Sequence, residues 1–214
     1  MNKTKAHQIY KLADGTRVPG VTTILQVLNK PALVKWANNL GLQGIDSTKY
    51  RDKMADIGTL AHLMILDYFK CEKSDYSEYS PDDVDKAENC LISFYAWTKE
   101  NDVKPIAVEQ QLVSEVFKYG GTVDLYCMLN GLPTLVDFKT GKAIYDEMFI
   151  QVAAYKMLLE EHKNIVDHVR ILRIGREDNE GFEDRKMANM DRYWYLFFHS
   201  MKIYNLQKQL KAGE

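Results

Sequence analysis

The segment Asp137-Phe138-Lys139 places an aspartate and a lysine two residues apart, and a second aspartate, Asp124, lies thirteen residues upstream. Between them, Asn130-Gly131 separates two β-rich runs. Both turn residues tolerate positive φ, so this pattern predicts a hairpin with a two-residue loop. Counting back from that loop places Asp124 opposite Asp137 to within about one residue. Lys139 then points to the same face as Asp137, because side chains alternate along a strand.

Two carboxylates that face each other across a strand pair repel, so a cation is expected between them. Lys139 supplies part of that charge, and the oxygen donors favour a hard divalent cation, Mg²⁺, or Mn²⁺ if a nitrogen ligand joins. Such a cation would bind a phosphate oxygen and lower the pKa of water, while Lys139 would orient that water or offset developing charge. The alternative is a surface strand on which Asp-x-Lys is incidental.

Three ordered motifs resemble the RecB-like branch of the PD-(D/E)XK nuclease superfamily, and within it the phage-type and CRISPR-associated exonucleases. These motifs are Gly121-Thr122-Val123-Asp124, Asp137-Phe138-Lys139-Thr140 and Gln151-Val152-Ala153-Ala154-Tyr155. The resemblance implies a restriction-endonuclease-like fold and a Mg²⁺- or Mn²⁺-dependent nuclease, in which Asp124, Asp137 and Lys139 are catalytic. Family members often bind an iron–sulfur cluster through four cysteines. This chain has three, Cys71, Cys90 and Cys127, at other places, so we expect no cluster.

The resemblance also implies a metal ligand upstream. Gly58-Thr59-Leu60-Ala61-His62 is similar to the family's histidine motif, and His62 would join Asp124, Asp137 and the main-chain carbonyl of Phe138. A histidine ligand would favour Mn²⁺ over Mg²⁺. The alternative for His62 is a packed or solvated residue on a helix face.

Glu109 lies in the strand expected before Asp124, and would fall beside it if the turn centred near Val116-Phe117. It would hold a water or a second metal, or else face solvent.

Gln151 and Tyr155 are four residues apart and share a helix face. By resemblance, Gln151 supports the lysine or contacts the scissile strand, and Tyr155 lines the nucleic-acid path. Core packing explains Tyr155 almost as well. Thr140 and Lys142 would contact phosphates, or belong to a plain loop.

The element order predicts a single α/β domain over 1–214, with a mixed central sheet flanked by helices. Residues 1–104 are expected to be mostly helical, 105–175 to form the catalytic sheet and a helix, and 190–211 to form a final helix. Residues 176–189 are charged and predict a mobile loop. The final helix is apolar almost all round, which predicts a core helix whose excess face could serve self-association.

The formal net charge of −2 argues against non-specific coating of nucleic acid or anionic membrane, without excluding a local basic groove. The polar start of the chain leads into no apolar run of signal-peptide length, and no run is long enough to span a membrane, which predicts a cytoplasmic protein.

The expected function is a deoxyribonuclease, an exonuclease acting on DNA ends, single- or double-stranded, in phage or prophage recombination or repair. Its expected partners, by resemblance, are DNA, a single-strand annealing or recombination protein, and further copies of itself. Three alternatives stay open: a structure-specific or nicking endonuclease on the same fold, a catalytically idle DNA-binding or recombination module, and an unrelated enzyme with a chance Asp-x-Lys.

Overall fold

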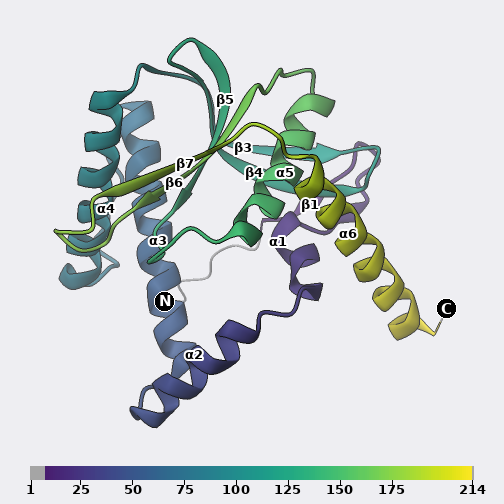
Figure 1. Ribbon diagram of the computed structural model, residues 1–214, viewed down its shortest axis with the longest axis horizontal. Helices are drawn as coiled ribbons and strands as arrows, with labels where there is room; N and C mark the ends of the chain where they lie inside the picture. Colours follow the sequence, from purple (N-terminus) through teal and green to yellow (C-terminus); the bar gives the residue numbers. More distant parts are fainter. Residues whose placement is uncertain (1–7, 214) are drawn as a thin grey trace.

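The computed structural model describes residues 8–213, and its first half is largely helical (Figure 1). A small hairpin, β1 (Tyr10–Lys11) and β2 (Arg17–Val18), comes first. The helices that follow are α1 (Val21–Ile24), the short 3₁₀ helix η1 (Leu25–Val27), α2 (Pro31–Leu42), α3 (Ser47–Lys70) and α4 (Pro81–Glu100). The side chains of Asp46 and Ser80 accept hydrogen bonds from main-chain N–H groups at the starts of α3 and α4, as good N-caps do.

The second half forms a five-stranded sheet in the order β3-β4-β5-β6-β7. The strands are β3 (Val103–Ser114), β4 (Tyr119–Leu129), β5 (Leu132–Lys139), β6 (His168–Ile174) and β7 (Phe182–Met187). Neighbours are antiparallel except β5 and β6, which are parallel and joined by helix α5 (Asp146–Glu161). The chain ends in α6 (Asp191–Ala212). The expected fold class, α/β with a mixed central sheet flanked by helices, is confirmed.

The β4–β5 hairpin has the register expected from its turn. Asn130 and Gly131 have φ values of 52° and 83°, as a two-residue hairpin turn requires. The ladder runs from Leu129 opposite Leu132 back to Leu125 opposite Val136, where it ends, one residue short of Asp124 and Asp137.

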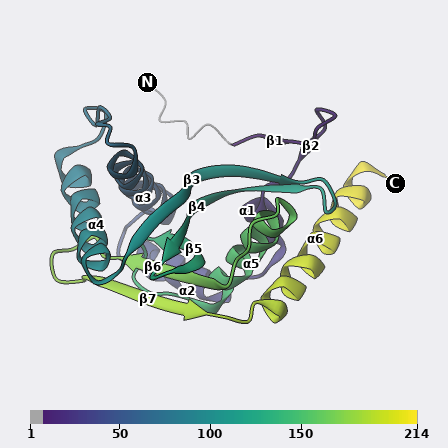
Figure 2. The same ribbon diagram turned by 90° about the horizontal axis from the view of Figure 1, so that it is seen from above.

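Hydrophobic cores lie on both faces of the sheet (Figure 2). One is formed with α1, α5 and α6, and includes Phe149 and Phe197. The other is formed with α3 and α4, and includes Phe94 and Trp97. Burial on both faces explains why β4 and β5 read as nearly continuous apolar runs.

Residues 182–187 were expected to lie in a mobile loop, and this was wrong, because they form strand β7 on β6. The sheet therefore extends beyond the predicted range 105–175. The strand has few apolar residues and is held by charged side chains instead. Asp184 accepts a hydrogen bond from Trp97 Nε1 at 2.7 Å and pairs with Arg170, while Arg173 Nε lies 3.5 Å from Glu183. These partners lie on other elements, so local sequence does not reveal the strand.

The expectation that α6 is core all round was also wrong. Within it only Phe197, Ser200 and Met201 are buried, whereas Leu196, Ile203, Leu206 and Leu210 are exposed. Figure 1 shows the C-terminal half of α6 extending away from the sheet. Among residues 8–213, no helix is long and apolar enough to cross a bilayer.

A substitution at Gly121 in β4 would test how tightly the sheet packs on α5. A Cβ at this position would lie 2.6 Å from Cε1 of the Tyr155 ring. Gly121→Ala should therefore lower the free energy of unfolding by about 2 kcal/mol, measured by urea denaturation. Gly41→Ala is the matched control, because nothing lies within 4 Å of its Cβ in helix α2. It should be neutral or stabilising by about 0.5 kcal/mol, and equal effects at the two glycines would contradict the packing.

Candidate active site

The regular alternation of side chains between the two faces of the sheet is interrupted at two neighbouring positions, Glu109 in β3 and Asp124 in β4. The β3–β4 pairs on either side are Val108 with Leu125 and Gln110 with Val123, which places Glu109 opposite Asp124. Residues two apart on a strand normally share a face, yet Val123 and Leu125 pack in opposite cores. Glu109 has a φ of 49°, in the left-handed region that non-glycine residues seldom adopt. The irregularity therefore coincides with the two carboxylates.

His62 of α3 joins these two carboxylates. Its Nδ1 lies 3.5 Å from Glu109 Oε1 and 3.7 Å from Asp124 Oδ1, and one ligand atom from each of the three residues fits within 4.8 Å. Asp124 Oδ2 accepts a hydrogen bond from the main-chain N–H of Phe138 at 2.8 Å, just beyond the end of the β4–β5 ladder. The Phe138 ring meets the His62 ring edge-on, with centroids 5.9 Å apart. His62 and Asp124 are thus both held by Phe138.

Asp137 and Lys139 form a second, deeper pair. Asp137 is 1% exposed, and its Oδ2 lies 2.5 Å from Lys139 Nζ. That oxygen has no well-angled hydrogen bond within residues 8–213, so the contact is a close ion pair rather than a satisfied carboxylate. In this structure Asp137 therefore pairs with Lys139 and lies outside the three-residue cluster of His62, Glu109 and Asp124. A role for Asp137 and for the Phe138 carbonyl as metal ligands stays a prediction.

Burial and nearby charges shift the pKa values of Asp137, Asp124 and His62. Burial raises the pKa of Asp137 to about 6, with Lys139 opposing the shift. Burial also raises the pKa of Asp124, against the effect of His62 and Lys139. For His62, burial lowers the pKa, but Asp124 and Glu109 together raise it above its usual value. His62, Asp124 and Asp137 therefore hold protons more tightly than free side chains do, which is what burial together with excess negative charge produces.

The cluster has the donor set and the spacing of a divalent metal site. Ligands about 2.1 Å from an octahedral cation lie about 3.0 Å apart when adjacent and about 4.2 Å apart when opposite. The separations of 3.5 and 3.7 Å from His62 fall between these values, so small side-chain movements suffice. One imidazole with two carboxylates suits Mn²⁺ or Mg²⁺ rather than a soft metal. The residues present fit the expected ion.

An open cleft of about 610 Å³ gives access to this cluster. Its walls come from α3, β3, β4 and the end of β5. His62, Glu109, Lys139 and Thr140 line it, as do Gln8, Gln111 and Thr122 at the side of β3 and β4. Sequence reasoning missed this second group, because lone glutamines and threonines on strands are too common to signal a site. A substrate can therefore reach His62, Glu109 and Lys139 together.

Gln151 and Tyr155 lie behind the site rather than in the cleft. Gln151 Nε2 donates a hydrogen bond to Tyr155 Oη at 2.8 Å, and the Tyr155 ring packs over Gly121. Tyr155 is 6% exposed, so the expectation that it lines the nucleic-acid path is corrected. Burial raises the pKa of Tyr155 well above its usual value, with a contribution from Asp137. The Tyr155 phenol therefore stays neutral beside the buried carboxylate of Asp137, and it packs behind the site without lining the cleft.

Comparison with known proteins gives only distant similarity. No family model matches the chain, and no curated protein matches it. One similar solved structure is an alkaline exonuclease, LHK-Exo, from Laribacter hongkongensis, with 9% identity and a TM-score of 0.40 over 91% of this chain and 92% of that one. The same exonuclease in complex with dAMP gives 10% identity and a TM-score of 0.38 over 75% and 91% of the two chains.

The left-handed backbone at Glu109 should cost conformational free energy, and this cost can be measured by substitution. Glycine adopts positive φ without steric cost, whereas alanine does not. Glu109→Gly should therefore unfold with a free energy about 1 kcal/mol higher than Glu109→Ala, measured by urea denaturation. The same pair of substitutions at Gln110, whose φ is negative, should give the opposite order. A Glu109→Ala protein as stable as Glu109→Gly would contradict the strain.

Proposed function

We propose that this protein is a divalent-metal-dependent nuclease that hydrolyses phosphodiester bonds in DNA. One observation carries the proposal: His62 and Glu109, which line an open cleft, converge with the buried Asp124 beside the Asp137–Lys139 pair. The resemblance of the motifs around Asp124, Asp137 and Gln151 to RecB-like nucleases supports the same activity. A cation held by the cluster would polarise a phosphate oxygen and make water a better nucleophile at neutral pH.

Lys139 would act as a cation rather than as a base. Burial lowers its pKa, but Asp137 and Asp124 together raise the pKa above its usual value, so the ammonium stays protonated. A protonated lysine at the cleft wall can attract the phosphate and offset the charge that develops on it. Asp137 holds Lys139 in place, and it would be drawn towards a cation that bound between it and Asp124.

The proposed ligands are His62, Glu109 and Asp124, with Asp137 and the Phe138 carbonyl as further candidates. Glu109 thereby changes role: it was expected to hold a water or a second metal, and we now propose it as a primary ligand. Thr140 would contact the backbone of the bound strand. We propose DNA ends as the substrate because the motif resemblance points to exonucleases. The annealing or recombination partner, the phage setting and the homo-oligomer rest on that resemblance alone.

Metal-dependent cleavage is the first test. End-labelled single- and double-stranded DNA is incubated with the protein and Mg²⁺, Mn²⁺ or EDTA. We expect cleavage with either metal and none with EDTA. Lys139→Ala should lower kcat by at least about 100-fold, because it removes charge that stabilises the transition state. Lys104→Ala, an exposed lysine paired with Asp102, is the matched control and should cleave normally. Cleavage in EDTA, or normal cleavage by Lys139→Ala, would contradict the proposal.

A closed circular substrate separates the two modes of cleavage. An exonuclease leaves covalently closed DNA intact, whereas a structure-specific or nicking endonuclease cuts it. We expect the circle to survive and its linearised form to be degraded, as resolved on agarose gels. Nicking of the circle would favour the endonuclease. Tight DNA binding with no metal uptake and no cleavage would favour an idle binding module.

Metal affinity should depend on pH, because a metal ligand must lose its proton to bind. The pKa of Asp137 is raised to about 6 and that of His62 above its usual value, so both groups are increasingly protonated below pH 6. We expect the Kd for Mn²⁺, measured by calorimetry, to be at least about tenfold weaker at pH 5.5 than at pH 7.5. Glu109→Gln should weaken binding at both pH values, whereas Glu100→Gln, exposed at the end of α4, should not. A pH-independent Kd would contradict this cluster as the site.

A further inference from the structure

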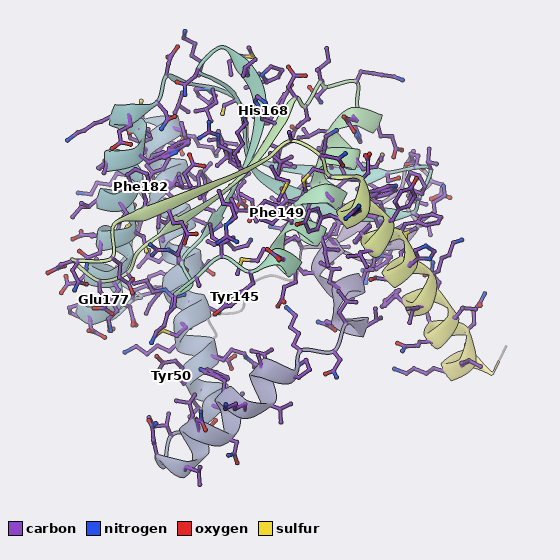
Figure 3. All side chains as sticks on the ribbon, viewed as in Figure 1. Tyr50, Tyr145, Phe149, His168, Glu177 and Phe182 are labelled. Atoms are coloured by element: carbon purple, nitrogen blue, oxygen red, sulfur yellow. The ribbon has the colours of Figure 1, made fainter. Side chains whose placement is uncertain are left out.

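Arg176 lies just after β6, at the start of the turn that leads to β7. Figure 3 labels the next residue, Glu177, at this turn beside helices α3 and α4. The turn is fixed from two sides: Asn89 of α4 donates a hydrogen bond to the Arg176 carbonyl at 3.0 Å, and Glu180 accepts one from its main-chain N–H at 2.8 Å. The Arg176 side chain therefore starts from an anchored backbone, although the sequence around it predicted a mobile loop.

The guanidinium of Arg176 reaches the wall of the cleft. Its Nη2 donates a hydrogen bond to Thr140 Oγ1 at 2.9 Å, and Thr140 lines the cleft next to Lys139. Nη1 lies 3.0 Å from the Met54 sulfur of α3. Thr140 Oγ1 can come this close to α3 because residue 58 is glycine, where a Cβ would lie 3.0 Å from that oxygen. Contacts from α3, from α4 and from the turn after β6 thus hold the Arg176 guanidinium against the Thr140 hydroxyl.

This arginine differs from the other arginines of the same hairpin. Arg170 and Arg173 pair with the carboxylates of Asp184 and Glu183. Within residues 8–213, the guanidinium of Arg176 forms no ion pair with a carboxylate, because the neighbouring carboxylate of Glu180 accepts from the main-chain N–H of Arg176 instead. A sulfur and a hydroxyl do not neutralise a charge. A half-buried cation without a counter-ion is unfavourable unless an anion complements it.

The hydrogen bond to Arg176 also determines what Thr140 can do. A guanidinium only donates, so Thr140 Oγ1 is the acceptor in this bond. The hydroxyl keeps its own hydrogen, and no acceptor for it is found among residues 8–213. It therefore has an O–H to offer to an anionic oxygen in the cleft, and the adjacent positive charge strengthens that donor.

We propose that Thr140 and Arg176 form a second phosphate-binding subsite, which holds the phosphodiester next to the one that is cleaved. The cleft crosses the sheet from β3 to β5, so a strand bound at His62, Glu109 and Asp124 continues past Lys139 to Thr140. Thr140 donates to the phosphate, and Arg176 acts as a positioning residue that orients Thr140 and supplies positive charge that no carboxylate pairs directly. The subsite rests on the proposed function only in that its ligand is a nucleic-acid backbone.

The salt dependence of DNA binding tests the subsite without requiring cleavage. A short fluorescent single-stranded oligonucleotide is titrated in EDTA by anisotropy over a range of salt concentrations. Each phosphate contact by a cation contributes about −0.7 to the slope of log K against log salt for single strands. We expect Arg176→Gln to weaken binding about tenfold and to reduce the slope by about 0.7, while Arg176→Lys largely keeps the slope. Thr140→Val should weaken binding with the slope unchanged, and Thr140→Ser should restore it.

Arg173→Gln is the matched control, because it removes an equal charge from the same hairpin, at a residue paired with Glu183. Its slope should equal that of the wild type. The subsite is overturned if Arg176→Gln keeps the wild-type slope, if Arg173→Gln loses as much, or if the wild type binds no oligonucleotide. Failure of the proposed function would show itself separately, as no metal uptake and no cleavage by the wild type, whatever the slopes.

Discussion

The structure is organised around a repulsion, because Glu109, Asp124 and Asp137 bring three carboxylates to one poorly solvated corner beside a single lysine. Burial and mutual repulsion raise the pKa values of Asp124 and Asp137, and Lys139 compensates only part of the charge. A divalent cation between them would reduce the repulsion and could coordinate Asp137 Oδ2, which has no hydrogen-bond partner within residues 8–213. The clustered carboxylates, which destabilise the protein without a metal, therefore favour the binding of a divalent cation and, through it, of a phosphate.

The sheet accommodates this corner through local irregularity. The β4–β5 ladder ends one residue short of the two aspartates, and Asp124 takes the Phe138 N–H as its own hydrogen-bond partner. Glu109 has a left-handed φ, and at Asp124 the alternation of side chains along β4 shifts, so that Val123 and Leu125 pack in opposite cores. Strain and an interrupted ladder are tolerated because α3, α4, α5 and α6 pack both faces of the sheet around them. A rigid frame thus holds a strained site, as functional sites often require.

Local chemistry made much of this predictable. The Asn130-Gly131 turn determines the hairpin register, and counting from it brought Asp124 to Asp137. A turn expected near Val116-Phe117 likewise brought Glu109 to Asp124. What escaped prediction depends on partners distant in sequence: β7 is held by Trp97 and Arg170, Tyr155 is buried over Gly121, and Arg176 reaches Thr140. Likewise, the pairing of Glu109 with His62 follows from three-dimensional spacing that motif order does not specify.

The most direct test of the central claim is a crystal structure of the protein grown with Mn²⁺, with anomalous diffraction used to locate the ion. The account predicts a manganese peak in the cleft, about 2.2 Å from His62 Nδ1 and from one oxygen each of Glu109 and Asp124. Asp137 and the Phe138 carbonyl are the candidates for its remaining protein ligands. A crystal with no manganese in the cleft, or with the ion bound without His62 and Glu109, would contradict it.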